Sequence, residues 1–304
     1  MSAKCAAGTE YYAEQYGLMA GDPNPELPKC ITQALIHVRG QSEGVALNKS
    51  SAVTVNFHPD AEHCGDIVVA SLARDGVYRS QFETGISNGA LATHLGTGRL
   101  LWERQIFGGA YEHCEPEDRP KYGALNFMNR PVGASPRFGS AYLRLKSHVL
   151  NRTTFCFPDS HMGAQYFGTA DRMGLLERLD DFRAIPDPLD HYVEAHVHGS
   201  LEFEKSVDAV VLDPSHRGTE VEDAAHTLGC PVEWHHGFRM TVAQLSDCVS
   251  YRSEEAACLA ASLFEDEILT PAILGAARRA EHADPKTFKH LWHCLARFGS
   301  PVIL

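Results

Sequence analysis

The stretch that most constrains the fold is residues 192–199, where small apolar residues alternate with large polar ones. A β-strand sends successive side chains to opposite faces. One face would therefore carry Tyr192, Glu194, His196 and His198. The other face would carry only valine and alanine. This alternation predicts a strand whose apolar back joins a core and whose front lines a reactive cleft. The alternative is a half-buried strand with a polar, solvated outside.

Composition and charge exclude several classes of partner. The chain has 304 residues with 44% hydrophobic and 22% charged residues, which is typical of a globular protein. The net charge of −12 argues against binding to nucleic acid or to anionic membranes, since both require a basic surface. We find neither a transmembrane-length apolar run nor a secretory signal sequence. Nine cysteines without a Cys-x-x-Cys motif predict reduced thiols and a cytosolic protein, a pattern that delivery into a host cytosol by a type III system would share.

The pattern of elements predicts an α+β protein in three parts. Residues 1–50 form a helical segment, 51–230 a mixed β core and 231–304 a helical region. The expected strands cover residues 53–57, 137–145, 152–157, 192–198 and 209–212. A short helix over residues 67–73 is stopped by Asp75-Gly76, and three helices cover residues 256–264, 271–280 and 285–297.

The segment from Tyr78 to Gly85 is a candidate ligand site. We expect a strand or extended loop over residues 77–82 and a turn-rich loop over 84–89. The segment combines a cation, aromatic rings, hydroxyls and an amide, which suits a ligand with phosphates and a flat ring. An exposed strand with a salt bridge is the alternative. Neither a Rossmann nor a P-loop glycine motif is present, so a nucleotide would be held in another way.

Two expected strands end in an acidic residue. His58-Pro59-Asp60 ends the first, where Asp60 is either a ligand contact or a helix cap. Asp159 follows the strand over 152–157 and would complement Glu194 if that strand end faces the cleft. A metal site is the competing interpretation. Its ligands would be Glu194, His196 and His198, completed by His58, Asp60, His235 or His236.

These residues resemble the poly(ADP-ribose) polymerase-like group of ADP-ribosyltransferases. In that fold a first strand ends in a histidine and precedes a short helix closed by glycine, an order that residues 56–60 and 67–76 share. A late strand presents the catalytic glutamate, as residues 193–199 would. More specifically, the chain is similar to a CteC-like family of bacterial enzymes over roughly residues 50–300. The matching blocks are residues 58–60, 78–85, 107–111, 119–126, 136–140, 153–160, 212–215 and 292–299.

The resemblance implies an ADP-ribosyltransferase-like split, mixed β-sheet core with helical additions at both ends. It implies a monomeric, metal-free bacterial effector that transfers ADP-ribose from NAD⁺ to a threonine hydroxyl of host ubiquitin and so blocks ubiquitination. Glu194 would be the catalytic glutamate, and either Asp60 or Asp159 the second acid. Glu220-Val221-Glu222 is a rival for the glutamate, because it has the family's Glu-x-Glu form.

The same resemblance implies where NAD⁺ would bind. His58 and Arg79 would hold phosphate or ribose, and Tyr78, Phe82 or Tyr111 would stack on nicotinamide. Ser80, Gln81, Thr84 and Gly85 would complete the site. Two alternatives stay open: a metal-dependent hydrolase or oxygenase built on Glu194, His196 and His198, and a non-enzymatic module that binds ubiquitin.

Overall fold

The computed structural model describes residues 27–300 except 49, 64 and 86–97. The helices expected within residues 1–26 and most of the turn-rich loop expected over 84–89 lie outside the described residues. None of the described helices combines the length and apolarity needed to cross a bilayer.

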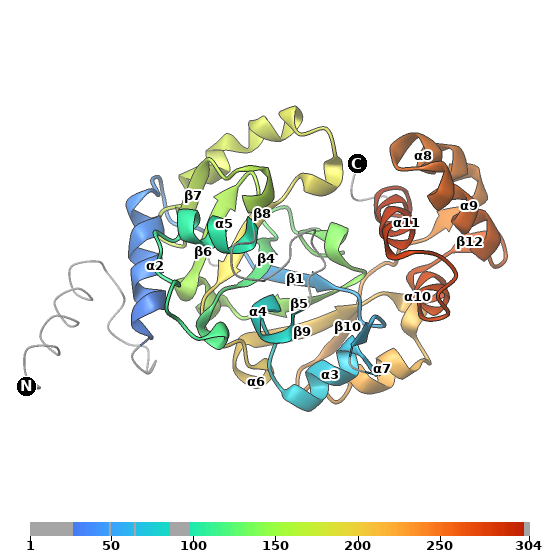
Figure 1. The fold of residues 1–304 in the computed structure, drawn as a ribbon, viewed down its shortest axis with the longest axis horizontal. Coiled ribbons are helices and arrows are strands. Elements are labelled where there is room, and N and C mark those ends of the chain that lie inside the picture. The colour runs from blue at the N-terminus through green and yellow to red at the C-terminus, as the bar shows by residue number, and fades with distance from the viewer. Residues whose placement is uncertain (1–26, 49, 64, 86–97, 301–304) are drawn as a thin grey trace, which may run out of the picture.

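An eight-stranded sheet forms the centre of the molecule (Figure 1). Its order is β10-β9-β5-β1-β4-β8-β6-β7, and neighbouring strands are antiparallel except β9 and β10. The bounds are β1 Val53–Phe57, β4 Lys121–Leu125, β5 Ala141–Leu145, β6 Thr153–Phe157, β7 Tyr166–Thr169, β8 Val193–Val197, β9 Val207–Leu212 and β10 Val232–Trp234. The sheet therefore extends slightly past the boundary expected at residue 230. This architecture confirms a mixed α+β protein.

The pairing between β1 and β4 is short. Only Val53 and Thr54 of β1 pair with β4, whereas β1 pairs with β5 from Thr54 to Phe57. The loop after β4 occupies the opening: Ala134 N donates to Thr54 Oγ1 at 2.9 Å, and Asn56 Nδ2 donates to Val132 O at 3.0 Å. The two halves of the sheet are thus joined by a short stretch of pairing and by side-chain bonds to one loop.

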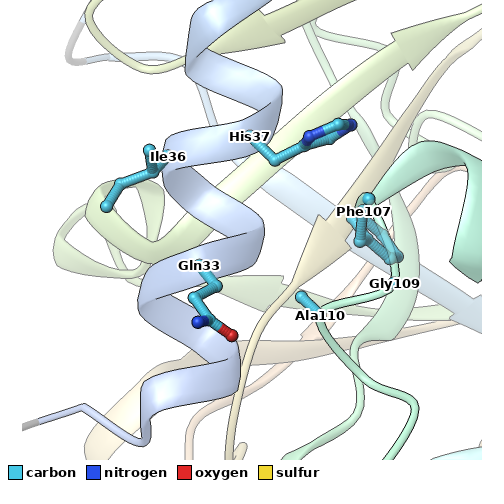
Figure 2. A pocket seen from close by; sticks show the side chains of 7 residues that line it. Gln33, Ile36, His37, Phe107, Gly109 and Ala110 are labelled. Carbon is cyan, nitrogen blue, oxygen red and sulfur yellow. The ribbon is translucent and has the colours of Figure 1, made fainter.

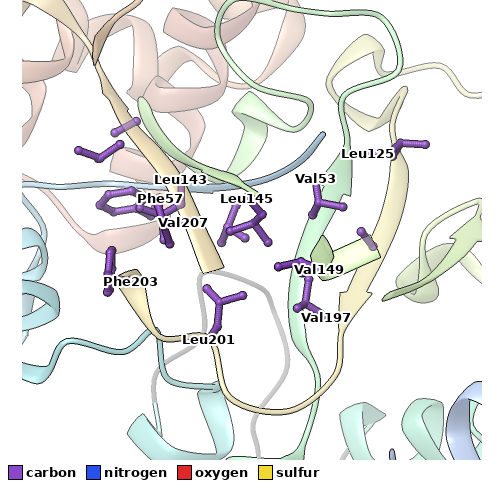
Figure 3. Packing of buried hydrophobic residues seen from close by; sticks show 14 of the residues in the cluster. Val53, Phe57, Leu125, Leu143, Leu145, Val149, Val197, Leu201, Phe203 and Val207 are labelled. Atoms are coloured by element: carbon purple, nitrogen blue, oxygen red, sulfur yellow. The ribbon is translucent and has the colours of Figure 1, made fainter. Parts of the chain in front are cut away.

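The apolar face of the sheet forms the largest core (Figure 3). Val193, Ala195 and Val197 of β8 belong to it, as the alternation predicts. The helices α3 Val68–Asp75 and α7 Glu220–Ala225 add Val69, Val221 and Ala225 to this core. Helix α3 ends where expected, at Gly76, which takes the left-handed conformation (φ 65°) that glycine adopts without strain.

Two further helices, α2 Lys29–Gly40 and α5 Gly98–Ile106, form a separate buried cluster over the opposite face near β6 and β7. This cluster includes Ile31 of α2, Ile106 of α5, and Phe107 and Tyr111 from the turn that follows α5. The apolar stretch expected at residues 31–38 is therefore the middle of α2. The remaining short elements are α4 Gln81–Thr84, α6 Phe203–Ser206, β2 Glu62–His63 and β3 Asp66–Ile67.

The C-terminal helices have their own core. They are α8 Leu245–Tyr251, α9 Glu254–Leu263, α10 Pro271–Arg279 and α11 Pro285–Phe298, with a small hairpin of β11 Met240–Thr241 and β12 Ile268–Leu269. Asp284 caps α11 by accepting bonds from two backbone amides, and Pro285 occupies its first turn. Trp292 of α11 donates its indole N–H to Pro136 O at 3.1 Å, which fastens these helices to the sheet.

Three expectations are wrong in detail. Residues 81 and 82, expected in a strand or extended loop, belong to α4, because Ser80 and Glu83 make a capping box and Gly85 closes the turn at φ 71°. The strand expected from 137 begins only at Ala141, because Pro136–Phe138 forms a 3₁₀ turn. Cys248 and Cys294 form a buried disulfide between α8 and α11, against the expectation that all thiols are reduced.

Candidate functional site

The polar face of β8 is buried rather than solvated. Glu194 is 7% exposed, and His196 and His198 are fully buried. Phe107 covers both imidazoles, with ring centroids 5.1 Å from His196 and 5.2 Å from His198. The alternative of a solvated outer face is therefore wrong for this strand, because the turn after α5 packs on it.

A continuous chain of hydrogen bonds runs along this face. Tyr111 Oη lies 2.6 Å from His198 Nδ1, and His198 Nε2 lies 2.9 Å from Thr154 Oγ1. Thr154 Oγ1 also lies 3.1 Å from His196 Nδ1. His196 Nε2 lies 2.8 Å from Glu194 Oε1. Thr154 comes from β6, which pairs with β8 and places Thr154 directly opposite His196.

The surroundings of Glu194 favour its ionised form, the carboxylate. Burial alone raises the pKa of this group, but the hydrogen bonds from His196 and Ser160 and the charge of Arg99 lower it, and the net pKa lies below the ordinary value. Cys156 of β6 lies opposite Glu194 and contacts Oε1 through its Sγ at 3.7 Å. A buried group that stays ionised beside a few fixed donors can stabilise positive charge on a ligand.

Asp159 lies close enough to this carboxylate for its pKa to respond to the charge of Glu194. It caps the 3₁₀ turn Ser160–Met162, where its Oδ1 accepts from Met162 N at 3.0 Å, and its Oδ2 accepts from the hydroxyl of Tyr192. Burial and then the charge of Glu194 raise the pKa of Asp159. The pKa values of the two carboxyl groups are thus pushed apart, an arrangement that suits acid and base roles in one site.

Asp60 and His58 lie elsewhere. The carboxylate of Asp60 faces α10, where Arg278 Nη2 lies 3.3 Å from Oδ1. His58 packs edge-on against Trp292 with ring centroids 4.8 Å apart, and desolvation followed by the charge of Arg278 lowers its pKa well below the ordinary value. Both residues join the sheet to the C-terminal helices. Of the two candidate acids, Asp159 is the one whose pKa responds to Glu194, whereas Asp60 is paired with α10.

Residues 78–85 stand beside the start of β4 rather than beside Glu194. Arg79 is exposed and paired with Asp75 at 2.8 Å. Burial raises the pKa of Tyr78 to about 12. The Phe82 ring lies 4.5 Å below the guanidinium of Arg119. Ser80 caps α4 together with Glu83; Gln81 and Thr84 lie within that helix, and Gly85 ends it.

Tyr111 is 2% exposed and belongs to the hydrogen-bond chain, so its ring is not open to stack on a ligand. Beside it, a surface hollow of about 380 Å³ lies between α2 and the turn after α5 (Figure 2). Gln33, His37 and Phe107 are among its lining residues. Phe107 thus lines this hollow while its ring contacts the two imidazoles.

Several residues of the site were missed from the sequence. Arg99, in the first turn of α5, lies with its guanidinium 4.2 Å from the centroid of the Tyr122 ring and carries a charge that Glu194 senses. Arg119 bonds to Glu103 at 2.5 Å and to Tyr111 O at 2.8 Å. Charge alone did not distinguish these arginines from surface arginines, and only their contacts with Tyr122, Glu103 and Tyr111 identify them.

A group that could hold a metal ion differs from the one expected. In the described part of the chain, Cys156, Glu194 and His196 offer ligand atoms within 4.8 Å of one another. His198 is bonded instead to Tyr111 and Thr154. His235 bonds to Ser140 O at 2.7 Å and His236 to Ser300 Oγ at 3.0 Å, so neither completes the group. The thiol, carboxylate and imidazole would suit a zinc-like ion.

The rival glutamates have a structural explanation. Glu220 and Glu222 lie in the first turn of α7, where Thr219 caps the helix and acidic side chains favour the helix dipole. Glu222 accepts a bond from Gly218 N at 2.6 Å, and Glu220 is an exposed partner of Arg279. They are not on a strand that faces the site.

A comparison with known families accounts for most of the chain. A family model described as "Protein of unknown function (DUF3626)" matches residues 52–181 and 175–298. The chain belongs to this family. No curated protein matches this chain. The DUF3626 match runs from β1 through α11, and its two segments share one sheet because β8 from the second pairs with β4 and β6 from the first. Asp159 lies in the first segment and Glu194 in the second.

Proposed function

We propose that this protein transfers ADP-ribose from NAD⁺ to a hydroxyl acceptor, as a mono-ADP-ribosyltransferase. The observation that carries the proposal is the Glu194–Asp159 pair, in which one buried carboxyl has a lowered pKa and its neighbour a raised one. The short pairing between β1 and β4 is compatible with the split sheet of the fold that the sequence resembles.

The chemistry follows from the charges. The bond between nicotinamide and the ribose carbon breaks, its electron pair leaves with neutral nicotinamide, and positive charge develops on the ribose, as in glycoside hydrolysis. Glu194 as an oriented carboxylate would bond to the ribose 2′-hydroxyl and stabilise that charge. Asp159 would accept the proton of the attacking hydroxyl, whose oxygen forms the new bond to the ribose carbon.

The acceptor in this proposal is a threonine of host ubiquitin, which rests on the resemblance alone. The protein would act as a monomer in the cytosol of a host cell after delivery by a type III system. The negative net charge favours a partner with a basic surface and disfavours nucleic acid.

The test is to incubate the protein with labelled NAD⁺ and ubiquitin and to measure the intact mass of ubiquitin. The wild type should add one ADP-ribosyl group, Glu194→Gln should not, and Glu220→Gln should resemble the wild type. Equal labelling by wild type and Glu194→Gln would refute the assignment of Glu194. Ubiquitin binding without any NAD⁺ consumption would instead support a non-enzymatic binding module.

A metal-dependent hydrolase or oxygenase is the second candidate, favoured by the proximity of Cys156, Glu194 and His196. Stoichiometric metal in the purified protein, lost in Cys156→Ser, together with an activity that a chelator abolishes would support it. ADP-ribosyl transfer that persists in excess chelator would exclude it.

A further inference from the structure

The chain of side chains behind Glu194 has a definite direction. A carboxylate only accepts hydrogen bonds, so the proton between Glu194 Oε1 and His196 Nε2 belongs to the imidazole. At the far end, burial raises the pKa of Tyr111 far above its ordinary value, so its hydroxyl keeps a proton to donate. Burial lowers the pKa of the fully buried His198 well below the ordinary value, which leaves that ring with a single N–H.

With both imidazoles neutral, these end conditions allow one arrangement. If Tyr111 donates to His198 Nδ1, the proton of His198 must be on Nε2 and points at Thr154. A neutral His196 with its proton on Nε2 toward Glu194 has only a lone pair on Nδ1, so that nitrogen accepts the one hydroxyl proton of Thr154. Four donors meet four acceptors without a missing or surplus proton.

We propose that Tyr111, His198, Thr154 and His196 are positioning residues whose one-directional hydrogen-bond chain holds Glu194 in place as an oriented carboxylate. The effect of these residues on catalysis rests on the proposed function. The existence of the hydrogen-bond chain does not depend on it. Each member is buried and lies on a sheet strand or directly after one, or, for Tyr111, in the packed turn after α5. Removing one bond at the centre would leave buried donors and acceptors unpaired on both sides, which is costly.

Thr154 is the residue to change, because it is the link between the two imidazoles. Thr154→Val keeps the shape but removes the hydroxyl, and Thr154→Ser restores the hydroxyl. The neighbouring Thr153 provides a matched control: it is equally buried, on the opposite face of β6, and its hydroxyl donates to Val149 O at 2.8 Å outside the chain. Thr153→Val therefore removes a buried hydroxyl without touching the chain.

The first measurement is ¹⁵N NMR of the imidazoles in the wild type, which does not depend on any activity. We expect both His196 and His198 to be neutral and protonated on Nε2. Protonation of either ring on Nδ1, or an imidazolium at His198, would overturn the inference even if the protein proves to be an ADP-ribosyltransferase. If Thr154→Val fails to fold, the wild-type spectrum by itself still tests the direction of the hydrogen-bond chain.

The second measurement is NAD⁺ cleavage and transfer by the same variants. Thr154→Val should lower kcat about 10- to 100-fold with little change in KM for NAD⁺, because the chain orients the carboxylate without binding substrate. Thr154→Ser should recover most of the loss, and Thr153→Val should keep the wild-type kcat. A wild-type kcat in Thr154→Val would overturn the positioning role. If neither the wild type nor any variant consumes NAD⁺, the proposed function fails. The tautomers of His196 and His198 measured by NMR still show whether the hydrogen-bond chain exists.

Discussion

Gly275 in α10 faces Asp60, in the turn after β1, so closely that a Cβ on the glycine would lie 1.4 Å from Asp60 Oδ2. The carboxylate therefore reaches α10 only because residue 275 has no side chain. The guanidiniums of Arg278 and Arg279 lie 3.3 Å and 3.7 Å from the same carboxylate. This contact joins the sheet to the C-terminal helices and explains why Asp60 is turned away from Glu194.

Gly275→Ala should destabilise the protein by about 3 kcal/mol, because the methyl group must displace a buried, ion-paired carboxylate. Chemical denaturation measures the effect. Gly40→Ala at the end of α2 is the matched control: nothing lies within 4 Å of the added methyl, so its stability should be unchanged or slightly increased. Equal effects of the two substitutions would show that the Gly275–Asp60 contact does not exist.

Asp159→Asn should lower ADP-ribosyl transfer by about 100-fold or more, because the amide cannot accept the proton of the acceptor hydroxyl. Asp60→Asn should leave kcat unchanged and lower the thermal midpoint, since it weakens the ion pairs with Arg278 and Arg279. Initial rates and thermal unfolding of both variants separate the roles. The opposite result would make Asp60 the second acid.

Transfer and simple NAD⁺ hydrolysis should differ in their dependence on pH. Hydrolysis needs ionised Glu194, whose pKa is lowered, so its rate should fall only below about pH 4.5. Transfer also needs ionised Asp159, whose pKa is raised, so its rate should begin to fall at a higher pH as the solution is acidified. Rates with and without acceptor across the acid range measure this. Coincident acid limbs would argue against Asp159 as the base.

Asp187 connects the loop before β8 to the C-terminal helices. It accepts from the Tyr251 hydroxyl at 2.5 Å, pairs with Arg137 at 3.2 Å and also contacts Arg252. Asp187→Ala should cost about 3 kcal/mol, because it leaves partly buried cations without their partner. Asp171→Ala is the control, since that carboxylate is half exposed in its pair with Arg39 and should cost less than about 1 kcal/mol. Urea denaturation compares the two.

Asp190 should make stability depend on pH. Burial raises its pKa to about 6 from the ordinary 3.8, so the folded protein holds this proton more tightly than the unfolded chain. Its contribution to the free energy of unfolding therefore decreases as pH rises from 3.8 to about 6. The stability of Asp190→Asn relative to wild type should increase over this range. A difference that does not change with pH would contradict the raised pKa.

The local pattern predicted much of the framework. Strand β1, the faces of β8 and the stop of α3 at Gly76 follow from side-chain period and turn chemistry, which act between neighbours in sequence. The same is true of the extent of α11, expected over residues 285–297. The secondary structure of residues 78–85 was harder to predict, because the capping box of Ser80 and Glu83 lies inside a pattern that also suits an extended segment.

The amino-acid sequence by itself determined that Glu194, His196 and His198 share one face of a strand, because that depends only on the two-residue repeat. Only the tertiary structure decided what faces them. Strand order places Thr154 between the two imidazoles, and packing of the turn after α5 buries that face. It also places Asp159 where its pKa responds to Glu194, and Asp60 in a pair with α10. These contacts join segments far apart in the chain, and their energies come from burial and hydrogen bonds that no local pattern records.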